Sequence, residues 1–377
     1  MDRVKLLQDL VRIPSENNGI TGYEGEVVRC YYDFLRKEGI DAQLVYTEEI
    51  PHYDSHPGRL IEHSLRNRPL VTAALKGDRP GKTLLLLAHA DTVPVGNLSD
   101  WEDSPFSGTV KDGFVYGRGT SDDKWGMAVM ASLIIRLKEE GCHFPGKLVI
   151  AAVPDEESGG GNGTVGVFAS GIKADEAIYL DGGSNLTIWH AGLGGILAKI
   201  YGTDREKIVE EILNVKREIK KRIDAHMAFG PEFFTVIEKQ FYITSARPDG
   251  SVSFFMDFLP GEDVEEKKKE LEARFPGQKI VWTSRELPAS FVAKEAPLVA
   301  DLQKAYANGN NGEKLPAVGG VQSDQGLVLK FGNTPCVCFG CGRRGLPGSS
   351  HLPNECVEIA HMEKVENALK NYVENYL

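Results

Sequence analysis

The sequence predicts an α/β protein in which a mostly parallel sheet, covered by helices, is interrupted by a smaller inserted domain. Two observations support this fold class. Strand-like apolar segments alternate with amphipathic helical segments in the first half of the chain, as they do in parallel sheets built from β-α units. The alternation breaks between residues 195 and 290 and resumes from 291. With 377 residues, the chain is long enough for two domains.

The elements before the break follow from hydrophobic spacing. Residues 2–12 and 23–38 have apolar residues at helical spacing and predict two surface helices. Residues 41–83 are irregular, and "PHYDSHPGRLIEHSLRNRP" within them predicts a long, exposed, insertion-like loop that borders a site, before "LVTAALKG" returns to a strand. Residues 113–141 predict a strand, a tight loop and an apolar-faced helix. Core strands are predicted by "LLLLA", "KLVIAAV" and "EAIYL".

The segment 195–290 has a different order of elements. It reads as a strand, a strongly charged helix, two strands around the turn "RPDG", a second helix and a last strand. This β-α-β-β-α-β order is the ferredoxin-like arrangement, which can stand as its own small domain. The charge run of the first helix is typical of a solvated face. We therefore expect one domain from 1–194 and 291–377 and an inserted domain from 195–290.

Composition excludes several function classes. The net charge of -11 and the pI near 5.4 argue against a protein that binds nucleic acid. The N-terminus lacks the apolar core of a signal peptide, and no apolar window approaches the ~20 residues of a membrane span. Cysteines at 336, 338 and 341 fit no common zinc spacing, so we interpret them as buried strand thiols rather than a metal site. We expect a cytoplasmic protein with reduced cysteines.

Acidic or histidine side chains follow the apparent core strands. The carboxyl ends of parallel strands lie along one edge of an open sheet, so these segments converge there. One such charge is often only an exposed loop residue, but the repetition indicates a site. Clustered carboxylates repel and need a counter-charge, which a divalent metal supplies; imidazole and carboxylate ligands suit zinc. The residues are His89 and Asp91, Asp122 and Asp123, Asp155 to Glu157, and Asp181.

The motifs around these residues resemble those of a known family. "HADTVP", "YGRGTSDDKWGMA", "PDEESGG", "YLDGG", "SDQGL" and "GSSHLPNE" occur in this order across nearly the whole chain. Their order and spacing are similar to those of the dinuclear zinc hydrolases that include acetylornithine deacetylase, succinyl-diaminopimelate desuccinylase, aminoacylase and glutamate carboxypeptidase. That family also carries an inserted lid domain. The resemblance implies a zinc-hydrolase catalytic domain with a ferredoxin-like lid.

The resemblance also implies a set of metal ligands. Two zinc ions per chain, with cobalt or manganese as substitutes, would be bound by His89, Asp122, Glu157, Asp181 and His351. Asp122 would bridge both ions, while His89 and Asp181 complete the first site. Glu157 and His351 would complete the second. Without the resemblance, His351 would be interpreted as a surface loop histidine.

Asp91 and Glu156 have catalytic roles in the same comparison. Asp91 would hydrogen-bond the His89 imidazole and fix its orientation, as metal-bound histidines usually require. Glu156 would be the general base that takes a proton from a metal-activated water, which attacks an amide carbonyl, and then returns the proton to the leaving nitrogen. The peptide bond between Asp122 and Asp123 is expected to be cis, as it is in relatives.

The sequence departs from the family in the lid. Relatives commonly carry a histidine-bearing loop after the first lid strand, and this histidine reaches a neighbouring active site; here "YGTDREKIVEEIL" runs straight into the helix. His226 is not an obvious replacement. Where relatives often have an arginine that binds the substrate carboxylate, this chain has Phe255, Met256 and Asp257. Arg247 and Arg343 are speculative substitutes.

Two function classes follow. The first is a zinc-dependent amidohydrolase that cleaves an N-acyl amino acid or a short peptide, without nucleic-acid or membrane partners. The second is a binding or regulatory protein on the same scaffold, with catalysis weakened by the altered lid. The presence of both Asp91 and Glu156 favours the enzyme. The oligomeric state is left open, because the lid surface that commonly pairs in relatives is the part that differs.

Overall fold

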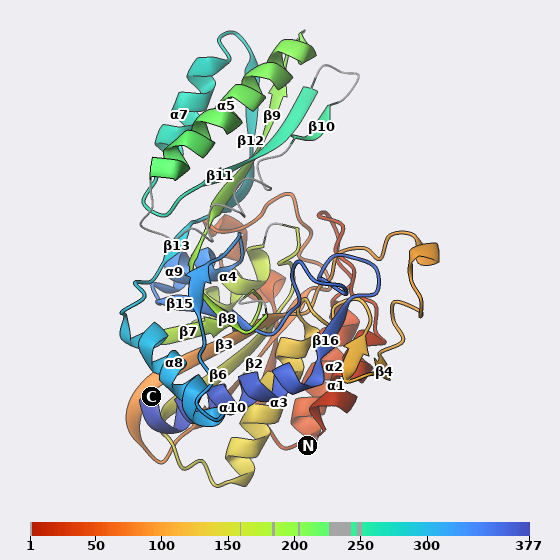
Figure 1. The fold of residues 1–377 in the computed structure, drawn as a ribbon, viewed down its shortest axis with the longest axis vertical. Coiled ribbons are helices and arrows are strands. Elements are labelled where there is room, and N and C mark those ends of the chain that lie inside the picture. The colour runs from red at the N-terminus through yellow and green to blue at the C-terminus, as the bar shows by residue number, and fades with distance from the viewer. Residues whose placement is uncertain (1, 159, 183–184, 203, 226–242, 247–250) are drawn as a thin grey trace.

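The structure, a computed structural model, describes residues 2–158, 160–182, 185–202, 204–225, 243–246 and 251–377 (Figure 1). A larger α/β body contains both ends of the chain, and a smaller α/β unit lies above it in this view. The chain leaves the larger body between β8 and β9 and returns to it between β12 and β13, so the smaller unit is an insertion.

The larger body is built on a nine-stranded sheet with the order β1-β2-β6-β3-β7-β15-β8-β13, and β14 pairs with β8. The central strands β6, β3, β7 and β15 run parallel, and the pairs towards the edges are mostly antiparallel. The mostly parallel sheet predicted from the sequence therefore holds for its centre. The strands are β1 (Ala42–Tyr46), β2 (Pro69–Lys76), β3 (Arg79–His89), β6 (Pro145–Val153), β7 (Glu176–Tyr179), β8 (Thr187–Gly192), β13 (Ser290–Phe291), β14 (Ala317–Gly319) and β15 (Cys336–Gly340).

Helices cover both faces of this sheet, because the core strands are apolar on both sides. Leu84 and Leu86 pack on one face in a core that includes α1, α2, α3, α8 and α10, while Leu85 and Leu87 pack on the other with α4 and α9. The helices are α1 (Arg3–Val11), α2 (Gly25–Lys37), α3 (Lys124–Glu139), α4 (Asn162–Ala169), α8 (Pro297–Gly309), α9 (Gln325–Gly332) and α10 (Ile359–Tyr376).

The smaller unit has a four-stranded sheet with the order β10-β11-β9-β12. Its chain order is β9 (Gly194–Tyr201), α5 (Arg205–Ala225), β10 (Ile243–Ala246), β11 (Ser251–Phe258), α7 (Val264–Arg274) and β12 (Lys279–Leu287). This is the β-α-β-β-α-β order that the sequence predicts, and it encloses a separate apolar core. We propose residues 195–290 as a lid domain, with 1–194 and 291–377 as the catalytic domain. The turn "RPDG" lies outside the described residues.

Shorter elements complete the catalytic body. A three-stranded sheet has the order β16-β5-β4. Its strands are β4 (Thr109–Lys111), β5 (Phe114–Tyr116) and β16 (Cys356–Glu358), and the 3₁₀ helices are η1 (Thr47–Glu49), η2 (Tyr53–Ser55) and η3 (Leu98–Asp100). Among the described residues, no helix is long and apolar enough to cross a membrane. The cysteines at 336, 338 and 341 are buried and free, as expected.

The segment 41–83 differs from its prediction. Its start is the strand β1, which pairs antiparallel with β2, and the loop after it is not uniformly exposed. Tyr53 and Arg68 are 2% and 1% exposed, and His63 is 7% exposed. Their polar atoms have partners inside the protein, such as the Asn162 carbonyl, which accepts from the Tyr53 hydroxyl at 2.7 Å. The prediction of an exposed loop was therefore wrong for these residues. It relied on their polarity, but polar groups can be buried when they are hydrogen-bonded.

Candidate metal centre

The parallel centre of the sheet brings the predicted site residues together. His89 is the last residue of β3, and Glu156 and Glu157 follow the neighbouring strand β6. Asp181 follows β7 on the other side of β3. Asp122 lies in the loop between β5 and α3, and His351 lies between β15 and β16. The strand ends thus place most of these groups at one edge, as the sequence indicates.

The carboxylate of Asp122 lies between two imidazoles. His89 Nε2 is 2.8 Å from Asp122 Oδ1, and His351 Nε2 is 3.0 Å from Asp122 Oδ2. His351 Nε2 is also 2.9 Å from Glu157 Oε2. Each oxygen of this carboxylate therefore faces a different histidine, which is the geometry required of a bridging ligand.

Two overlapping groups of side chains can hold a metal ion. One is His89, Glu156 and Asp181, and the other is His89, Asp122 and Glu157; within each group the ligand atoms lie within 4.8 Å of one another. Both glutamates belong to a group, but it is Glu157 that pairs with His351. The two glutamates therefore have different neighbours within the site.

The charges of the site are unbalanced. Burial and the neighbouring Asp122 raise the pKa of Asp181 to about 7, and burial raises the pKa of Glu156 well above its usual range, with Asp181 adding to the effect. Burial also acts to raise the pKa of Asp122, but the hydrogen bonds to His351 and His89 hold it below its usual range. Packed carboxylates of this kind need positive charge to ionise together. Imidazole and carboxylate donors with excess negative charge fit divalent cations such as zinc.

Asp91 contacts the imidazole of His89, as expected, and also the residues that follow β6. The His89 Nδ1 atom lies 3.0 Å from the backbone carbonyl of Asp91, and the Asp91 carboxylate is 3.5 Å away. The main-chain carbonyl of Asp91 therefore makes the shorter contact with the imidazole, and the carboxylate lies beside it. The carboxylate also accepts the backbone N–H groups of Glu156 and Glu157, each at 3.0 Å. Asp91 thus holds both the histidine and the two glutamates.

Residues that sequence reasoning did not assign support the same loops. Glu355 Oε1 accepts backbone hydrogen bonds from Ser121 at 2.8 Å and from Asp122 at 3.1 Å. Glu355 is the last residue of the motif "GSSHLPNE". The motif drew attention to this residue, but its role could not be inferred from the sequence. The peptide bond between Asp122 and Asp123 is cis, as expected.

Comparison with known proteins places this fold and site in a family. A family model described as "Peptidase family M20/M25/M40" matches residues 85–375. The chain belongs to this family. M20/M25/M40 proteins are metal-dependent hydrolases that act on C–N bonds, in agreement with the enzyme class expected from the sequence.

Curated relatives of this M20 chain match over part of their length. Succinyl-diaminopimelate desuccinylase 2 of Ruegeria sp. (strain TM1040) is 30% identical over 182 residues, which are 47% of this chain and 40% of that protein. Succinyl-diaminopimelate desuccinylase of Methylobacterium nodulans is 36% identical over 165 residues, 44% of this chain and 37% of that protein. The matched region therefore spans less than half of these relatives.

Solved M20 structures share the whole fold. An M20 family metallo-carboxypeptidase from Sulfolobus solfataricus has a TM-score of 0.73 at 18% identity, covering 99% of both chains. The di-peptidase Dug1p from Saccharomyces cerevisiae has a TM-score of 0.71 at 16% identity, covering 98% of this chain and 95% of that chain. At these identities the likeness concerns the fold alone.

The lid of this M20 chain carries the departures seen in the sequence. Strand β9 ends at Tyr201 and helix α5 begins at Arg205. Asp257 is 3% exposed, accepts a hydrogen bond from Gln322 and has its pKa raised to about 7 by burial. It is therefore a buried group rather than a recognition group. His226 and Arg247 lie outside the described residues.

The two neighbouring arginines at 343 and 344 differ in their surroundings. Arg343 is engaged elsewhere, because its Nε donates to the Pro347 carbonyl at 2.9 Å and its guanidinium lies 5.0 Å from the centre of the Phe114 ring. The guanidinium of Arg344 lies 5.8 Å from the centre of the Trp189 ring. Burial lowers the pKa of Arg344, and Asp122 and Asp181 oppose that shift. Of the two arginines, Arg344 is therefore the one that interacts electrostatically with the carboxylates of the site.

Proposed function

We propose that the protein is a zinc-dependent amidohydrolase that cleaves the amide bond of an N-acyl amino acid or a short peptide. The observation that carries the proposal is the position of the Asp122 carboxylate between His89 and His351, with Glu157 paired to one of these histidines. A carboxylate shared in this way suits two ions ~3.5–4 Å apart. Metal-dependent hydrolysis of C–N bonds is the chemistry of the family to which the chain belongs.

The ligands divide into two sets around the shared carboxylate of Asp122. His89 and Asp181 would hold one ion, and Glu157 and His351 the other. When bound, such ions lower the pKa of water and polarise an amide carbonyl. The protein side chains then position these ions and handle the proton.

Glu156 is the proposed general base. Its backbone is fixed by the Asp91 carboxylate, and its side chain lies in the group that contains His89 and Asp181. From there Glu156 accepts a proton from water and donates it to the departing nitrogen, which keeps the leaving group from departing as an amide anion. A protein that only binds metal has no need of such a residue, so Glu156 favours the enzyme over the binding protein.

Arg344 is the proposed anchor for the carboxylate of the substrate. Its guanidinium faces Trp189, and none of the described side chains forms a hydrogen bond with it. The nearby carboxylates, Asp122 and Asp181, are those that the metal ions would neutralise. An arginine binds a carboxylate through two parallel hydrogen bonds, which fixes orientation as well as charge. The anchor suits an N-acyl amino acid or a peptide with a free carboxyl end.

Zinc content and activity test the proposal together. Purified protein loaded with zinc should bind up to two ions per chain and hydrolyse members of a panel of N-acetyl and N-succinyl amino acids and dipeptides. Hydrolysis should be lost with a chelator and return with zinc. A protein that binds zinc but cleaves no member of the panel would support the binding or regulatory alternative.

A further inference from the structure

The N-terminal segment 15–17 runs beside the end of β3, where the metal centre begins. Thr92 N donates to the Ser15 carbonyl at 3.0 Å, and Asn17 N donates to the Thr92 carbonyl at 2.8 Å. The Ser15 hydroxyl also donates to the Ala90 carbonyl at 2.7 Å. These contacts form a short parallel bridge, so the segment is held in register with residues 90–92.

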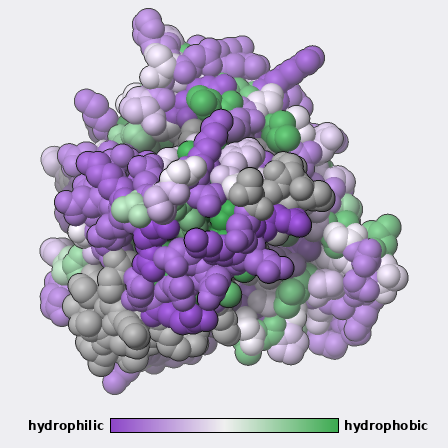
Figure 2. Space-filling view, turned by 90° about the horizontal axis from the view of Figure 1, so that it is seen from above, coloured by the Kyte–Doolittle hydropathy of each residue, from purple (hydrophilic) through white to green (hydrophobic). Residues whose placement is uncertain are grey.

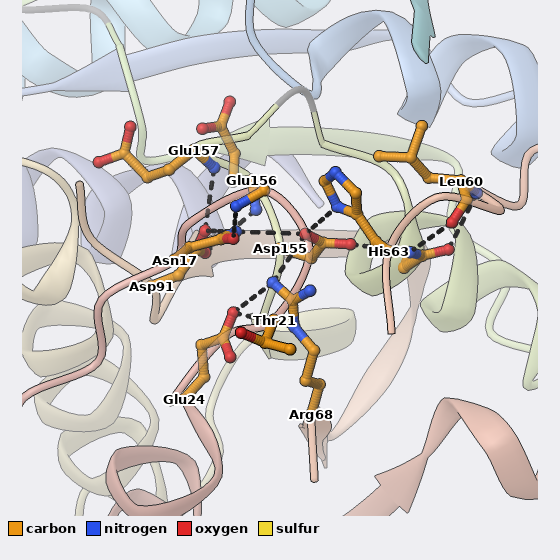
Figure 3. A network of polar contacts seen from close by, with 12 residues as sticks. Asn17, Thr21, Glu24, Leu60, His63, Arg68, Asp91, Asp155, Glu156 and Glu157 are labelled. Carbon is orange, nitrogen blue, oxygen red and sulfur yellow. Dashed lines mark hydrogen bonds and ion pairs between the residues drawn. The ribbon is translucent and has the colours of Figure 1, made fainter. Parts of the chain in front are cut away.

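This register places the Asn17 side chain between two buried carboxylates (Figure 3). Asn17 Nδ2 donates to Asp91 Oδ2 at 2.8 Å and to Asp155 Oδ1 at 3.2 Å. The orientation of the amide is fixed, because Asn17 Oδ1 accepts the backbone N–H of Gly19 at 3.0 Å. Asn17 is 3% exposed and both aspartates are fully buried. The amide thus separates two carboxylates that would otherwise repel.

Both carboxylates act on the same two residues. Asp91 accepts the backbone N–H groups of Glu156 and Glu157, and Asp155 directly precedes them in the chain. In Figure 3, the side chains of Glu156 and Glu157 project to one side of this network, away from Arg68. The Asp91–Asn17–Asp155 chain therefore fixes the backbone from which the proposed base and a proposed ligand extend.

Three further side chains contact the Asp155 carboxylate. Arg68 Nη2 lies 2.7 Å from Asp155 Oδ1 and 2.6 Å from Glu24 Oε1, and His63 Nδ1 lies 2.7 Å from Asp155 Oδ1. Asn162 Nδ2 donates to Asp155 Oδ2 at 2.8 Å. The loop before β2, which the sequence presents as an exposed insertion, thus contributes Arg68 and His63 to the support of the site.

We propose that Asn17 is a positioning residue for the metal centre. Its amide supplies the hydrogen bonds that keep Asp91 and Asp155 together, and through them it sets the positions of Glu156 and Glu157. This inference rests on the proposed function, because it assigns the supported residues to metal binding and proton transfer. Partners that orient metal ligands typically contribute ~10–100-fold to metal affinity or activity.

Three substitutions at this position distinguish the hydrogen-bonding role from packing. Asn17→Asp keeps the size and shape but replaces the donor with a third carboxylate, Asn17→Ala removes the group, and Asn17→Ser keeps one donor. If the donor matters, the Ser variant retains the most function and the Asp variant the least. If Asn17 only fills space, the isosteric Asp variant is the least affected.

Cobalt is the probe, because its visible absorption reports ligand geometry. For Asn17→Ala we expect the Co²⁺ dissociation constant to rise by ~10–100-fold, with an altered absorption spectrum. In the cobalt-loaded enzyme we expect kcat to fall while KM for the best panel substrate is retained. Ser15→Ala is the matched control, since it removes an equally buried hydrogen bond of the same segment that touches neither carboxylate. The two backbone hydrogen bonds with Thr92 remain and keep Asn17 in register. It should lower the melting temperature but leave the spectrum and kcat unchanged.

The outcomes separate this inference from the proposed function. A wild-type protein that binds no Co²⁺ overturns the proposed function, whatever the variants do. A wild-type protein that binds Co²⁺, with Ala and Ser variants of unchanged affinity and spectrum, overturns only the role of Asn17. Circular dichroism and the melting temperature show whether each variant is folded. If the Asp variant does not fold, the Co²⁺ affinity and the spectrum of the milder Ser variant test the role of Asn17.

Discussion

Arg118 and Glu355 form a buried ion pair next to the metal centre, with 2.6 Å between Arg118 Nη1 and Glu355 Oε2. The second oxygen of Glu355 accepts the backbone N–H groups of the loop that ends at Asp122, at 2.8 to 3.1 Å. Burial raises the pKa of Glu355 to about 7, and Arg118 opposes that shift. The pair therefore connects the loop that contains Asp122 to the segment that follows His351.

Glu355→Gln tests this tie. The amide keeps the size of the side chain but leaves the Arg118 charge buried and unpaired, and breaking a buried pair in this way costs ~3–5 kcal/mol. We expect a lower melting temperature and weaker metal binding, measured by thermal unfolding and metal titration. Asp41→Asn is the control, because Asp41 pairs with Arg36 at the surface, 82% exposed, where a pair contributes ~0–1 kcal/mol. Equal effects of the two substitutions would contradict the role of Glu355.

Glu156→Gln and Glu157→Gln should have different effects. The first keeps the shape of the proposed base but cannot accept a proton, so we expect turnover to fall by ~10²–10⁴-fold with metal retained. The second removes a charge that pairs with His351, so we expect metal to be lost. Turnover and metal content measured on both variants check the assignment, which fails if the two behave alike in both assays.

Arg344→Ala should affect substrate binding more than the chemical step. Loss of a hydrogen bond to a charged group costs ~1.5–3 kcal/mol, so we expect KM to rise by roughly ten-fold or more with kcat less changed. Arg343→Ala is the neighbouring control, because that side chain is engaged with Pro347 and Phe114. A substrate analogue without the carboxylate should be cleaved equally by wild type and Arg344→Ala. If KM rises equally in both variants, Arg344 is not the anchor.

The sequence predicted where the proposed ligands lie but not the groups that support them. The position of His89, Glu157 and Asp181 at one edge was predicted because parallel strands end there, which is a local pattern repeated along the chain. Asn17 and Arg68 were missed because their partners are distant: Asn17 meets Asp91 across 74 positions, and Arg68 meets Asp155 across 87. Single polar residues in loops carry no periodic signal, so only the folded arrangement reveals such pairs.

The secondary structure follows the same division. The long core strands and helices were predicted, since their apolar residues recur with a regular period. The strand β1 has only five residues, and although Leu44, Val45 and Tyr46 are apolar, this segment is too short to show a period, so the strand was missed. The contact between Asp91 and His89 was predicted, but the part that the main chain plays in it was not. Hydrogen bonds to the main chain, such as the one that the Asp91 carbonyl accepts from His89 Nδ1, do not depend on the type of the accepting residue, so the sequence does not reveal them.

Asp257 makes stability depend on pH. Its folded pKa of about 7 lies above the ordinary value near ~4 of an unfolded aspartate. Between these values the folded state holds a proton that the unfolded chain has lost. Rising pH must remove that proton, so the contribution of Asp257 to stability is present below pH ~4 and is lost as the pH passes through 7.

Asp257→Asn removes this dependence, since the amide stays neutral and its oxygen still accepts from Gln322. Relative to wild type, the variant should become more stable as the pH rises from 5 to 8. Urea unfolding at both pH values measures the difference. An identical difference at pH 5 and pH 8 would show that Asp257 does not carry a raised pKa.

The altered lid leads to a prediction about assembly. The direct connection from β9 to α5 leaves no room for the loop that carries a histidine into a neighbouring site in relatives. Two glutamates of α5 pair with α7, where Arg274 lies 2.6 Å from Glu211 and also pairs with Glu218. Seen from above, the surface is mostly hydrophilic, with small separate hydrophobic areas (Figure 2). These features are typical of a solvated surface rather than an apolar pairing interface.

We therefore expect an enzyme whose activity does not depend on dimerisation through the lid. Loss of one donor that stabilises the developing oxyanion typically costs ~10²–10³-fold in rate, so a donor supplied by a partner would be easy to detect. Specific activity measured across a dilution series, alongside molar mass in solution, gives the reading. Constant specific activity at concentrations where the protein is monomeric supports a site built from one chain. A specific activity that collapses as an oligomer dissociates would instead show that a second chain contributes a catalytic group.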